Sequence, residues 1–581
     1  MIKFSTVIRG FLIVLLIGFS AAVQAQNLDQ LVKRGLQRMT SKNYKGAIED
    51  FTQALELTPD DVNLFLNRSI AKRELKNYAG AIEDLGFALE INEADPNLFF
   101  NRGFVKSLSG DAEGAVEDYS RAIEIGPATA NMLFNRGIEK EKLKDLQGAL
   151  EDYNRALVLK PNYGDVYFNR GVVKSALNDA DGALKDYNKS IVYNPKNESA
   201  WFNRAIEKTN IQDYVGAIND YSNALKLVPD FVEAWFNRGY VKAKMNNHKG
   251  AILDFDKAID LDPAADIYFN RAISKAALNN HNAAISDYNS VIALDSAVEN
   301  VFFNRALSKI KLNDYKGAIP DLDLALGYNQ SNADIYFNKG VALRSLSKLK
   351  EAKDEFDKAL VLAPKNSDLY VNRGLIQLEL SDTAAAIEDF SNAIEYNKKN
   401  VPAYFNRGIQ YEKSGDFDAA LADYNSAIKL DPNNGDIYFN RGVVRAAIGD
   451  KKGALADYNS CIRLKPTNAG AWYNRGLAKY AAKDYLGALA DFNKVIQLDP
   501  SMPNIYFNRG IVRGQLKQFV AAITDYDKAI QMDPNYGDIY LNRGILKVIL
   551  KQPTGGCADL QKAAAMGVFA ATIEIEKSCK L

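Results

Sequence analysis

The sequence contains few of the residues from which catalytic and metal sites are usually built. Its 581 residues include three Cys and two His, which leaves little material for a metal centre or a Cys–His catalytic pair. It has no nucleophile elbow, phosphate loop or metal-ligand cluster of recognised spacing. The 72 Lys and Arg balance the 72 Asp and Glu, so the basic footprint of a nucleic-acid-binding protein is missing. We therefore expect no catalytic activity, no cofactor, no bound metal and no nucleic-acid partner.

Apolar residues, in contrast, are plentiful. Hydrophobic residues make up 47% of the chain and aromatic residues 10%. This content is ample for a packed core and excludes wholesale disorder. Ordinary globular units would divide a chain of this length into about four domains.

The first 25 residues have the pattern of a secretory signal peptide. Lys3 and Arg9 supply the positive start, residues 10–23 are uncharged and apolar, and the run ends in Val23-Gln24-Ala25. The apolar run is shorter than the roughly 20 residues of a membrane-spanning helix, although an uncleaved anchor helix remains the alternative. We expect cleavage after Ala25 and export to the periplasm or beyond, with no membrane insertion of the mature chain.

A segment of 34 residues recurs through the rest of the chain. Its marker is Phe-Asn-Arg-Gly or a close variant, and one interval, between Asn237 and Asn270, is one residue shorter. An earlier repeat has Lys33 in place of the Asn, so sixteen repeats fill about 27–567. The recurring residues are Asn67, Asn101, Asn135, Asn169, Asn203, Asn237, Asn270, Asn304, Asn338, Asn372, Asn406, Asn440, Asn474, Asn508 and Asn542.

Each repeat is numbered here so that this Asn is position 6, and its local signals predict a helix–turn–helix. Asp or Asn at position 16 is suited to cap the second helix, and Pro near position 32 to end it. Asp, Asn or Ser at position 2 is expected to cap the first helix. Examples at position 2 are Asn97, Asp165, Ser199 and Asp436. Pro320 lies inside a predicted second helix, where its effect cannot be foreseen.

These repeats resemble the tetratricopeptide repeat family over essentially the whole chain after the signal peptide. A typical repeat carries the family's residues at positions 4, 8, 11, 20, 24, 27 and 32, which are Tyr404, Gly408, Tyr411, Ala420, Tyr424, Ala427 and Pro432. The resemblance implies an all-α superhelix with the first helices on the concave side and the second helices on the convex side. Each helix pair can bury its apolar face only against its neighbours.

Two charged positions depart from the family pattern. Fifteen repeats have Arg at position 7 and Asp at position 23, and the one exception changes both, to Lys339 and Glu355. This paired change predicts an ion pair between the two helices, and a cationic row that grips anionic ligands is the alternative. Position 11 is often Lys or Arg, as in Lys106 and Lys242. No partner can be assigned to it, and a solvated charge is expected.

The row of Asn residues is the predicted ligand site. Position 6 should face the groove, where a side-chain amide can both donate and accept hydrogen bonds to an extended peptide backbone. The row resembles the Asn ladder of the O-linked N-acetylglucosamine transferases, which grips extended polypeptide. Apolar residues at position 9, such as Val172 and Leu307, adjoin it. The alternative is that Asn merely bonds neighbouring helices and that Phe at position 5 packs between them.

The sequence therefore predicts a non-catalytic scaffold that binds an extended peptide or partner segment of unknown identity. An architectural spacer of the cell envelope with an empty groove is the alternative, and reading of single-stranded RNA is disfavoured by the neutral charge.

The remaining Cys and His residues have structural interpretations. A C-terminal capping helix, 568–581, should return antiparallel to the last second helix. Cys557 and Cys579 would then lie opposite each other for a disulfide in an oxidising compartment, and two reduced core thiols are the alternative. Cys461 should stay an unpaired core thiol. His248 and His281 both occupy position 17, where aromatic residues usually stand, and are predicted to pack rather than to bind metal.

Overall fold

The computed structural model describes residues 26–295, 300–502 and 504–579. The predicted signal peptide, 1–25, lies outside them. The chain divides into two compact units, Met1–Val298 and Glu299–Leu581, and each is described by itself. All regular structure among the described residues is helical, so the all-α prediction is confirmed.

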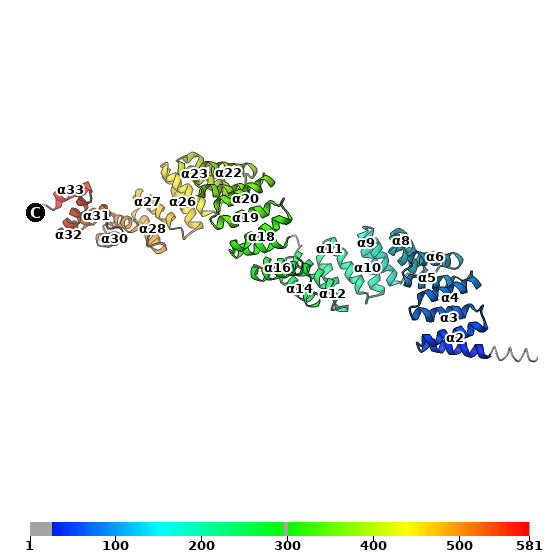
Figure 1. Cartoon of the computed structure of the whole chain (residues 1–581). Helices are drawn as coiled ribbons and strands as arrows, with labels where there is room; N and C mark the ends of the chain where they lie inside the picture. The colour runs from blue at the N-terminus through cyan, green and yellow to red at the C-terminus, as the bar shows by residue number, and fades with distance from the viewer. Residues whose placement is uncertain (1–25, 296–299, 503, 580–581) are drawn as a thin grey trace, which may run out of the picture. The chain divides into compact units, whose positions relative to one another are not determined.

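The helices of the first unit follow one another in antiparallel pairs (Figure 1). Residues 26–40 are also helical and precede them. The bounds are α2 (Tyr44–Leu57), α3 (Val62–Glu74), α4 (Tyr78–Ile91), α5 (Pro96–Ser109), α6 (Ala112–Ile125), α7 (Ala130–Lys142), α8 (Leu146–Leu159), α9 (Gly164–Ala176), α10 (Ala180–Tyr193), α11 (Glu198–Asn210), α12 (Tyr214–Leu227), α13 (Val232–Lys244), α14 (His248–Leu261), α15 (Ala265–Ala277) and α16 (His281–Leu294).

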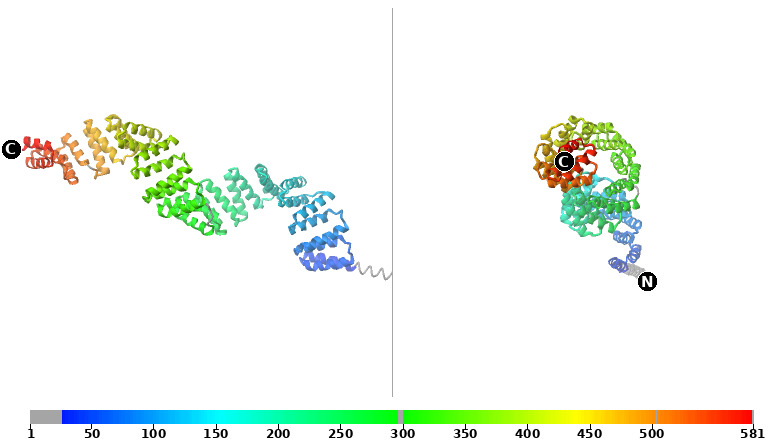
Figure 2. Two further views of the ribbon diagram at one scale, coloured as in Figure 1. Left: turned by 45° about the horizontal axis from the view of Figure 1, so that its top comes forward. Right: turned by 90° about the vertical axis from the view of Figure 1, so that its left-hand side faces the viewer.

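The second unit repeats the same pairing in chain order, as the two views of Figure 2 also show. Its helices are α17 (Val301–Lys311), α18 (Tyr315–Tyr328), α19 (Ala333–Ser345), α20 (Leu349–Leu362), α21 (Ser367–Glu379), α22 (Thr383–Tyr396), α23 (Val401–Ser414), α24 (Phe417–Leu430), α25 (Gly435–Ala447), α26 (Lys451–Leu464), α27 (Ala469–Ala481), α28 (Tyr485–Leu498), α29 (Ile505–Gln515), α30 (Phe519–Met532), α31 (Gly537–Ile549), α32 (Pro553–Ala565) and α33 (Phe569–Ser578). Pro320 lies inside α18, which continues past it to Tyr328.

Capping residues set where the second helices begin. Each second helix starts at position 17, and in most repeats the Asp or Asn at position 16 accepts a hydrogen bond from the backbone N–H three residues later, as predicted. Asp213, for example, accepts from Gly216 N at 3.0 Å. These side chains satisfy N–H groups that have no partner within the helix.

The prediction for the first helices was wrong by two residues. The capping residue precedes position 1, so Asp95 accepts from the backbone N–H of Asn97 at 2.8 Å. Asp436 likewise donates its backbone N–H to Asn434. Because these helices already begin at position 1, a residue at position 2 lies inside the first turn and cannot cap it.

The turn between the two helices of each repeat contains a residue in the left-handed backbone region at position 15. Gly110, Gly415 and Gly449 adopt it with φ of 90°, 81° and 82°. The other turns use non-glycine residues, such as Lys144 at φ 66° and Asn246 at φ 59°. A left-handed residue ends one helix and lets the next one begin at once, at a steric cost for any residue with a Cβ.

Glycine at position 8 lets the two helices of a repeat approach closely. A Cβ on Gly171 of α9 would lie 2.7 Å from the ring of Tyr187 on α10. The same ring packs against Phe168 at position 5, with centroids 6.2 Å apart. The aromatic residue at position 5 therefore packs inside its own repeat.

The last helix, α33, packs on α31 and α32. Its Ala571 is buried with Tyr540 and Ala563. The structure contains the predicted disulfide between Cys557 and Cys579, with Cα atoms 5.8 Å apart. Cys461 is a free, buried thiol, also as predicted, and burial raises its pKa to about 11.

Candidate functional site

Position 7 and position 23 form an ion pair in every repeat, as predicted. Arg238 is typical: its Nε and Nη2 donate to the two carboxylate oxygens of Asp254 at 2.9 and 2.7 Å. Asp254 is only 2% exposed. The exceptional pair is also formed, with Lys339 Nζ 3.1 Å from Glu355 Oε1. The guanidinium groups are thus engaged by buried carboxylates, which argues against a cationic row that grips anions.

The same arginines also connect successive repeats, which the sequence analysis missed. Nη1 of Arg238 donates to the Ser222 hydroxyl in the preceding repeat at 2.9 Å. In other repeats the acceptor at this place is Asn, Asp or Thr, as in Arg204 to Asn188 and Arg373 to Asp357. These acceptors all stand at position 25 of the preceding repeat, and a polar residue recurring at that position was the sequence signal that could have predicted the contact.

The cation at position 11 is not a solvated charge, and that expectation was wrong. Lys242 Nζ lies 2.6 Å from the Oδ2 atom of Asp254. One turn separates positions 7 and 11, so both cations reach the same carboxylate. Thirteen residues form this bond: Arg38, Lys72, Lys106, Lys140, Lys174, Lys208, Lys242, Lys275, Lys309, Arg445, Lys479, Arg513 and Lys547.

Three consecutive repeats lack this second cation, because position 11 is Leu343, Gln377 or Tyr411. In the middle one, burial raises the pKa of Asp389, against the lowering effect of Arg373. Gln377 is itself buried, and its side-chain oxygen has no hydrogen-bond partner among the described residues.

The first helices of successive repeats lie next to one another. Helix α7 contacts α9 and α9 contacts α11, whereas successive second helices are less closely associated within the described residues. A stack whose neighbours are closer on one side curves toward that side. The first helices therefore line the concave face.

The predicted Asn row lies on these first helices, and all fifteen side chains are half-buried. Residues Asn67 to Asn270 belong to the first unit and Asn304 to Asn542 to the second. In several repeats the amide donates to the carbonyl four residues earlier in its own helix, as Asn372 does to Asp368 at 2.8 Å. Asn508 instead donates to the Tyr473 hydroxyl of the preceding repeat at 2.7 Å. Part of the row thus contributes to local structure.

Two members of the row line adjoining cavities on the concave face of the first unit. Asn203 lines a cavity of about 300 Å³ between α9, α10 and α11. Asn169 lines one of about 540 Å³ between α7, α8 and α9. Val172 and Ala176 border both cavities, so they form one continuous groove. The position 9 residues in it, Ile138, Val172 and Ile206, give the groove an apolar floor.

Acidic side chains also reach this groove, and the sequence analysis did not single them out. Glu207 lines the smaller cavity and Glu141 the larger one. Glu141 accepts a hydrogen bond from the Tyr153 hydroxyl at 3.0 Å, and burial raises its pKa while Tyr153 and Lys144 lower it. The signal available in the sequence for Glu207 was Glu at position 10, which is mostly small or apolar in other repeats, whereas Glu141 stands at position 12.

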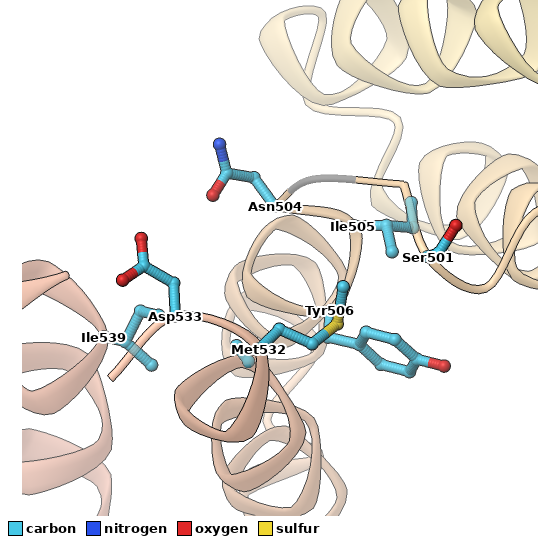
Figure 3. Close-up of a pocket in the computed structure, with 8 residues that line it drawn as sticks. Ser501, Asn504, Ile505, Tyr506, Met532, Asp533 and Ile539 are labelled. Atoms are coloured by element: carbon cyan, nitrogen blue, oxygen red, sulfur yellow. The ribbon is translucent and has the colours of Figure 1, made fainter. Parts of the chain in front are cut away.

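A further cavity of about 320 Å³ lies in the second unit, between the segments that precede α29 and α31. Asn504 and Asp533 project from these segments on the side opposite the Tyr506 ring (Figure 3). None of the predicted site residues lines it.

His248 and His281 are half-buried at the first residues of α14 and α16, in agreement with a packing role. No group of three or more His, Cys, Asp or Glu suited to a metal ion is found in the part of the chain that the structure describes. Within the same residues, every helix is too short or too polar to cross a membrane.

Comparison with protein families identifies the repeats. Models described as tetratricopeptide or TPR repeats match residues 211–246, 232–264, 303–367, 367–400, 390–422, 410–449, 435–468, 469–502 and 503–536. The chain belongs to the tetratricopeptide repeat family. Such repeats are generally non-catalytic and indicate a scaffold for protein partners. None of the curated proteins compared with the chain matches it.

Several solved tetratricopeptide-repeat structures are similar to the chain. A protein titled as the APC/C hetero-tetramer Cut9-Hcn1 is 17% identical, covers 82% of this chain and 95% of its own, and has a TM-score of 0.33. YrrB, described as a TPR protein with an unusual peptide-binding site, is 26% identical over 32% of this chain and 97% of its own, with a TM-score of 0.29. A repeat protein from Parabacteroides merdae is 20% identical over 43% and 98%, with a TM-score of 0.32. Because these TM-scores are below 0.5, the family assignment rests on the sequence repeats.

Proposed function

We propose that this tetratricopeptide-repeat protein holds an extended segment of a partner protein in the concave groove of its first helices. The continuous groove over α7, α9 and α11 supports the proposal most directly, because amides and apolar side chains alternate along it. Asn169 and Asn203 supply donors and acceptors for a peptide backbone, and Ile138, Val172 and Ile206 supply apolar contacts. Backbone contacts of this kind place little demand on the sequence of the bound segment.

The proposal includes export of the protein. The positive residues Lys3 and Arg9, the apolar run 10–23 and the small residue Ala25 support cleavage of a signal peptide. The disulfide between Cys557 and Cys579 suits an oxidising compartment. Mass spectrometry of the protein from fractionated cells tests this: a chain that begins at Gln26 in the exported fraction supports export, and an intact Met1 in the cytoplasm contradicts it.

Groove binding can be tested with peptides selected on the full-length protein from a random twelve-residue library. The double substitution Asn169→Ala with Asn203→Ala should weaken binding of the selected peptides by about tenfold, since each amide loses hydrogen bonds of about 0.5–1.5 kcal/mol. The matched control changes Asn223 and Asn392 to Ala, because both lie on second helices. Equal affinity for wild type and the groove variant, with unchanged helicity, would contradict the proposed site. Failure to select any peptide would favour a spacer.

A further inference from the structure

Glu207 of α11 is a buried carboxylate that borders the groove and forms no ion pair with the lysines that line it, Lys142 and Lys144. The residue is 6% exposed, and it borders the cavity of about 300 Å³ between α9 and α11. Its Oε1 atom accepts a hydrogen bond from the Ser175 hydroxyl of α9. Among the residues that the structure describes, no Lys or Arg forms an ion pair with it. A buried charge with one neutral hydrogen bond is expensive unless something pairs with it.

A second buried polar group lines the same cavity. Tyr187 of α10 is 2% exposed, and no described residue hydrogen-bonds to its hydroxyl. Burial and the nearby carboxylates of Glu207, Asp186 and Glu141 raise the pKa of this phenol, so the hydroxyl stays neutral. Gly171 brings the ring against α9. The cavity therefore presents a carboxylate and a phenol oxygen, which are both acceptors for a cationic donor.

The lysines nearest in sequence on these helices are already engaged. Lys174 of α9 lies 2.8 Å from Asp186, and Lys208 of α11 lies 2.8 Å from Asp220. Neither is bonded to Glu207, so its charge is left for a group from outside the chain.

The preceding repeats show what happens when the chain supplies the cation. Glu139 of α7 occupies the same position 10, is 2% exposed, and accepts from the Ser107 hydroxyl at 2.6 Å. Lys142, three residues later, lies 2.7 Å from Glu139 and neutralises it. In α11 the residue three positions after Glu207 is Asn210, which has no charge. The two carboxylates thus differ in whether a lysine three residues later pairs with them.

We infer that the cavity between α9 and α11 binds the side-chain ammonium or guanidinium of a lysine or arginine in the bound partner segment, with Glu207 as its counter-ion and Tyr187 as a second acceptor. This inference rests on the proposed groove binding. The ligand's stem would lie along Val172 and Ile206, while its backbone meets Asn203 at the rim. The site adds one cationic anchor to contacts that otherwise tolerate many sequences.

The test uses peptides selected from the random twelve-residue library on four full-length proteins: wild type, Glu207→Gln, Glu139→Gln and Asn210→Lys. Wild type and Glu139→Gln should enrich peptides with Lys or Arg at one fixed place. Glu207→Gln removes the charge and should lose that enrichment. Asn210→Lys keeps Glu207 but supplies an internal cation from an exposed position, so it should lose the enrichment as well.

Affinities of one selected peptide complete the test. Replacing its Lys by norleucine should weaken binding to wild type by about tenfold and to Glu207→Gln by less than about twofold. The inference would be overturned if wild type selects peptides with no preference for Lys or Arg, or if Glu207→Gln selects peptides with the same preference. Either result would leave groove binding intact. If wild type selects no peptide, groove binding fails and the inference fails with it.

Discussion

Arg238 and Lys242, one turn apart on α13, bind the same buried carboxylate of Asp254 at 2.7 and 2.6 Å. Thirteen repeats of this protein are therefore held by a charged triad rather than by a simple pair. The arginine stacks over Trp235, with its guanidinium carbon 4.6 Å from the ring centroid, and reaches the preceding repeat through Ser222. One side chain thus links two helices of its own repeat and a third from its neighbour.

The triad predicts different outcomes for the same substitutions in two repeats. Arg407 pairs with Asp423 in a repeat without a second cation, since position 11 is Tyr411. Removing Asp423 alone should cost about 3 kcal/mol, because the half-buried Arg407 is left without its counter-ion. Arg407→Met with Asp423→Leu should be much less costly. The corresponding double change at Arg238 and Asp254 should stay costly, because it leaves Lys242 without its partner.

Hydrogen–deuterium exchange of the full chain can measure these differences repeat by repeat, which suits a repeat protein that need not unfold as one unit. We expect the double change at Arg238 and Asp254 to speed exchange in α13 and α14, relative to wild type. The double change at Arg407 and Asp423 should speed exchange in α23 and α24 by less. Equal effects in both repeats would show that Lys242 contributes nothing.

Gln377→Lys should stabilise its repeat by about 1 kcal/mol near neutral pH, because it supplies Asp389 with the cation found in thirteen other repeats. Since burial raises the folded-state pKa of Asp389, the folded form binds a proton more readily than the unfolded chain. Wild-type stability in this repeat should therefore fall as pH rises from below 3.8 through that pKa.

The lysine in Gln377→Lys should lower the pKa of Asp389, so the stability of this repeat should fall less as the pH rises. Exchange of α21 and α22, corrected for intrinsic rates at each pH, is the measurement. Gln377→Met is the control, since it adds no charge. A pH dependence identical in wild type and Gln377→Lys would contradict the assignment of Asp389 as its source.

The left-handed turns give a prediction about the backbone alone. Lys144→Gly should stabilise the repeat of α7 and α8 by about 1 kcal/mol, because glycine adopts φ of 66° without steric cost. Gly110→Ala should destabilise the repeat of α5 and α6 by a similar amount, although an added Cβ there would meet no atom within 4 Å. Relative to wild type, Lys144→Gly should raise the thermal unfolding temperature or slow exchange in its helices, and Gly110→Ala should do the opposite. A change of the same sign in both variants would exclude backbone strain as the cause.

The disulfide should stabilise the end of the second unit. Reduction of Cys557–Cys579 is expected to speed exchange in α33, with a loss of about 3 kcal/mol typical of a loop of this size. Exchange in α26, which carries the free Cys461, should not change. Thiol titration of the denatured, oxidised protein should find one free thiol. Three free thiols, or unchanged exchange in α33 after reduction, would contradict this role.

Periodicity allowed much of the fold to be predicted from the sequence. The helix pairs could be predicted from the 34-residue period, the small residues at position 8 and the capping residues at position 16. The contact between positions 7 and 23 could be predicted from the joint change to Lys339 and Glu355. Cys557 and Cys579 lie at equal distances along the chain from the turn before α33, so two antiparallel helices bring them together, and the disulfide could be predicted.

The remainder depended on geometry across repeats. Lys242 reaches Asp254 because the Oδ2 atom that already accepts from Arg238 Nε can accept a second hydrogen bond, which a sequence pattern does not reveal. The cap of the first helix was misplaced because the residues at positions 34 and 2 are both polar in several repeats. Glu207 stands out only when Lys142 at the end of α7 is compared with Asn210 at the end of α11.

Photo-cross-linking tests the central claim, that the groove of the first helices binds an extended segment, most directly. A selected peptide that carries benzophenone at its centre should label residues on α7, α9 and α11, with Ile138, Val172 and Ile206 among the sites located by mass spectrometry. An excess of unlabelled peptide should abolish the labelling. Cross-links confined to the second helices, or labelling that the excess peptide does not reduce, would contradict the account.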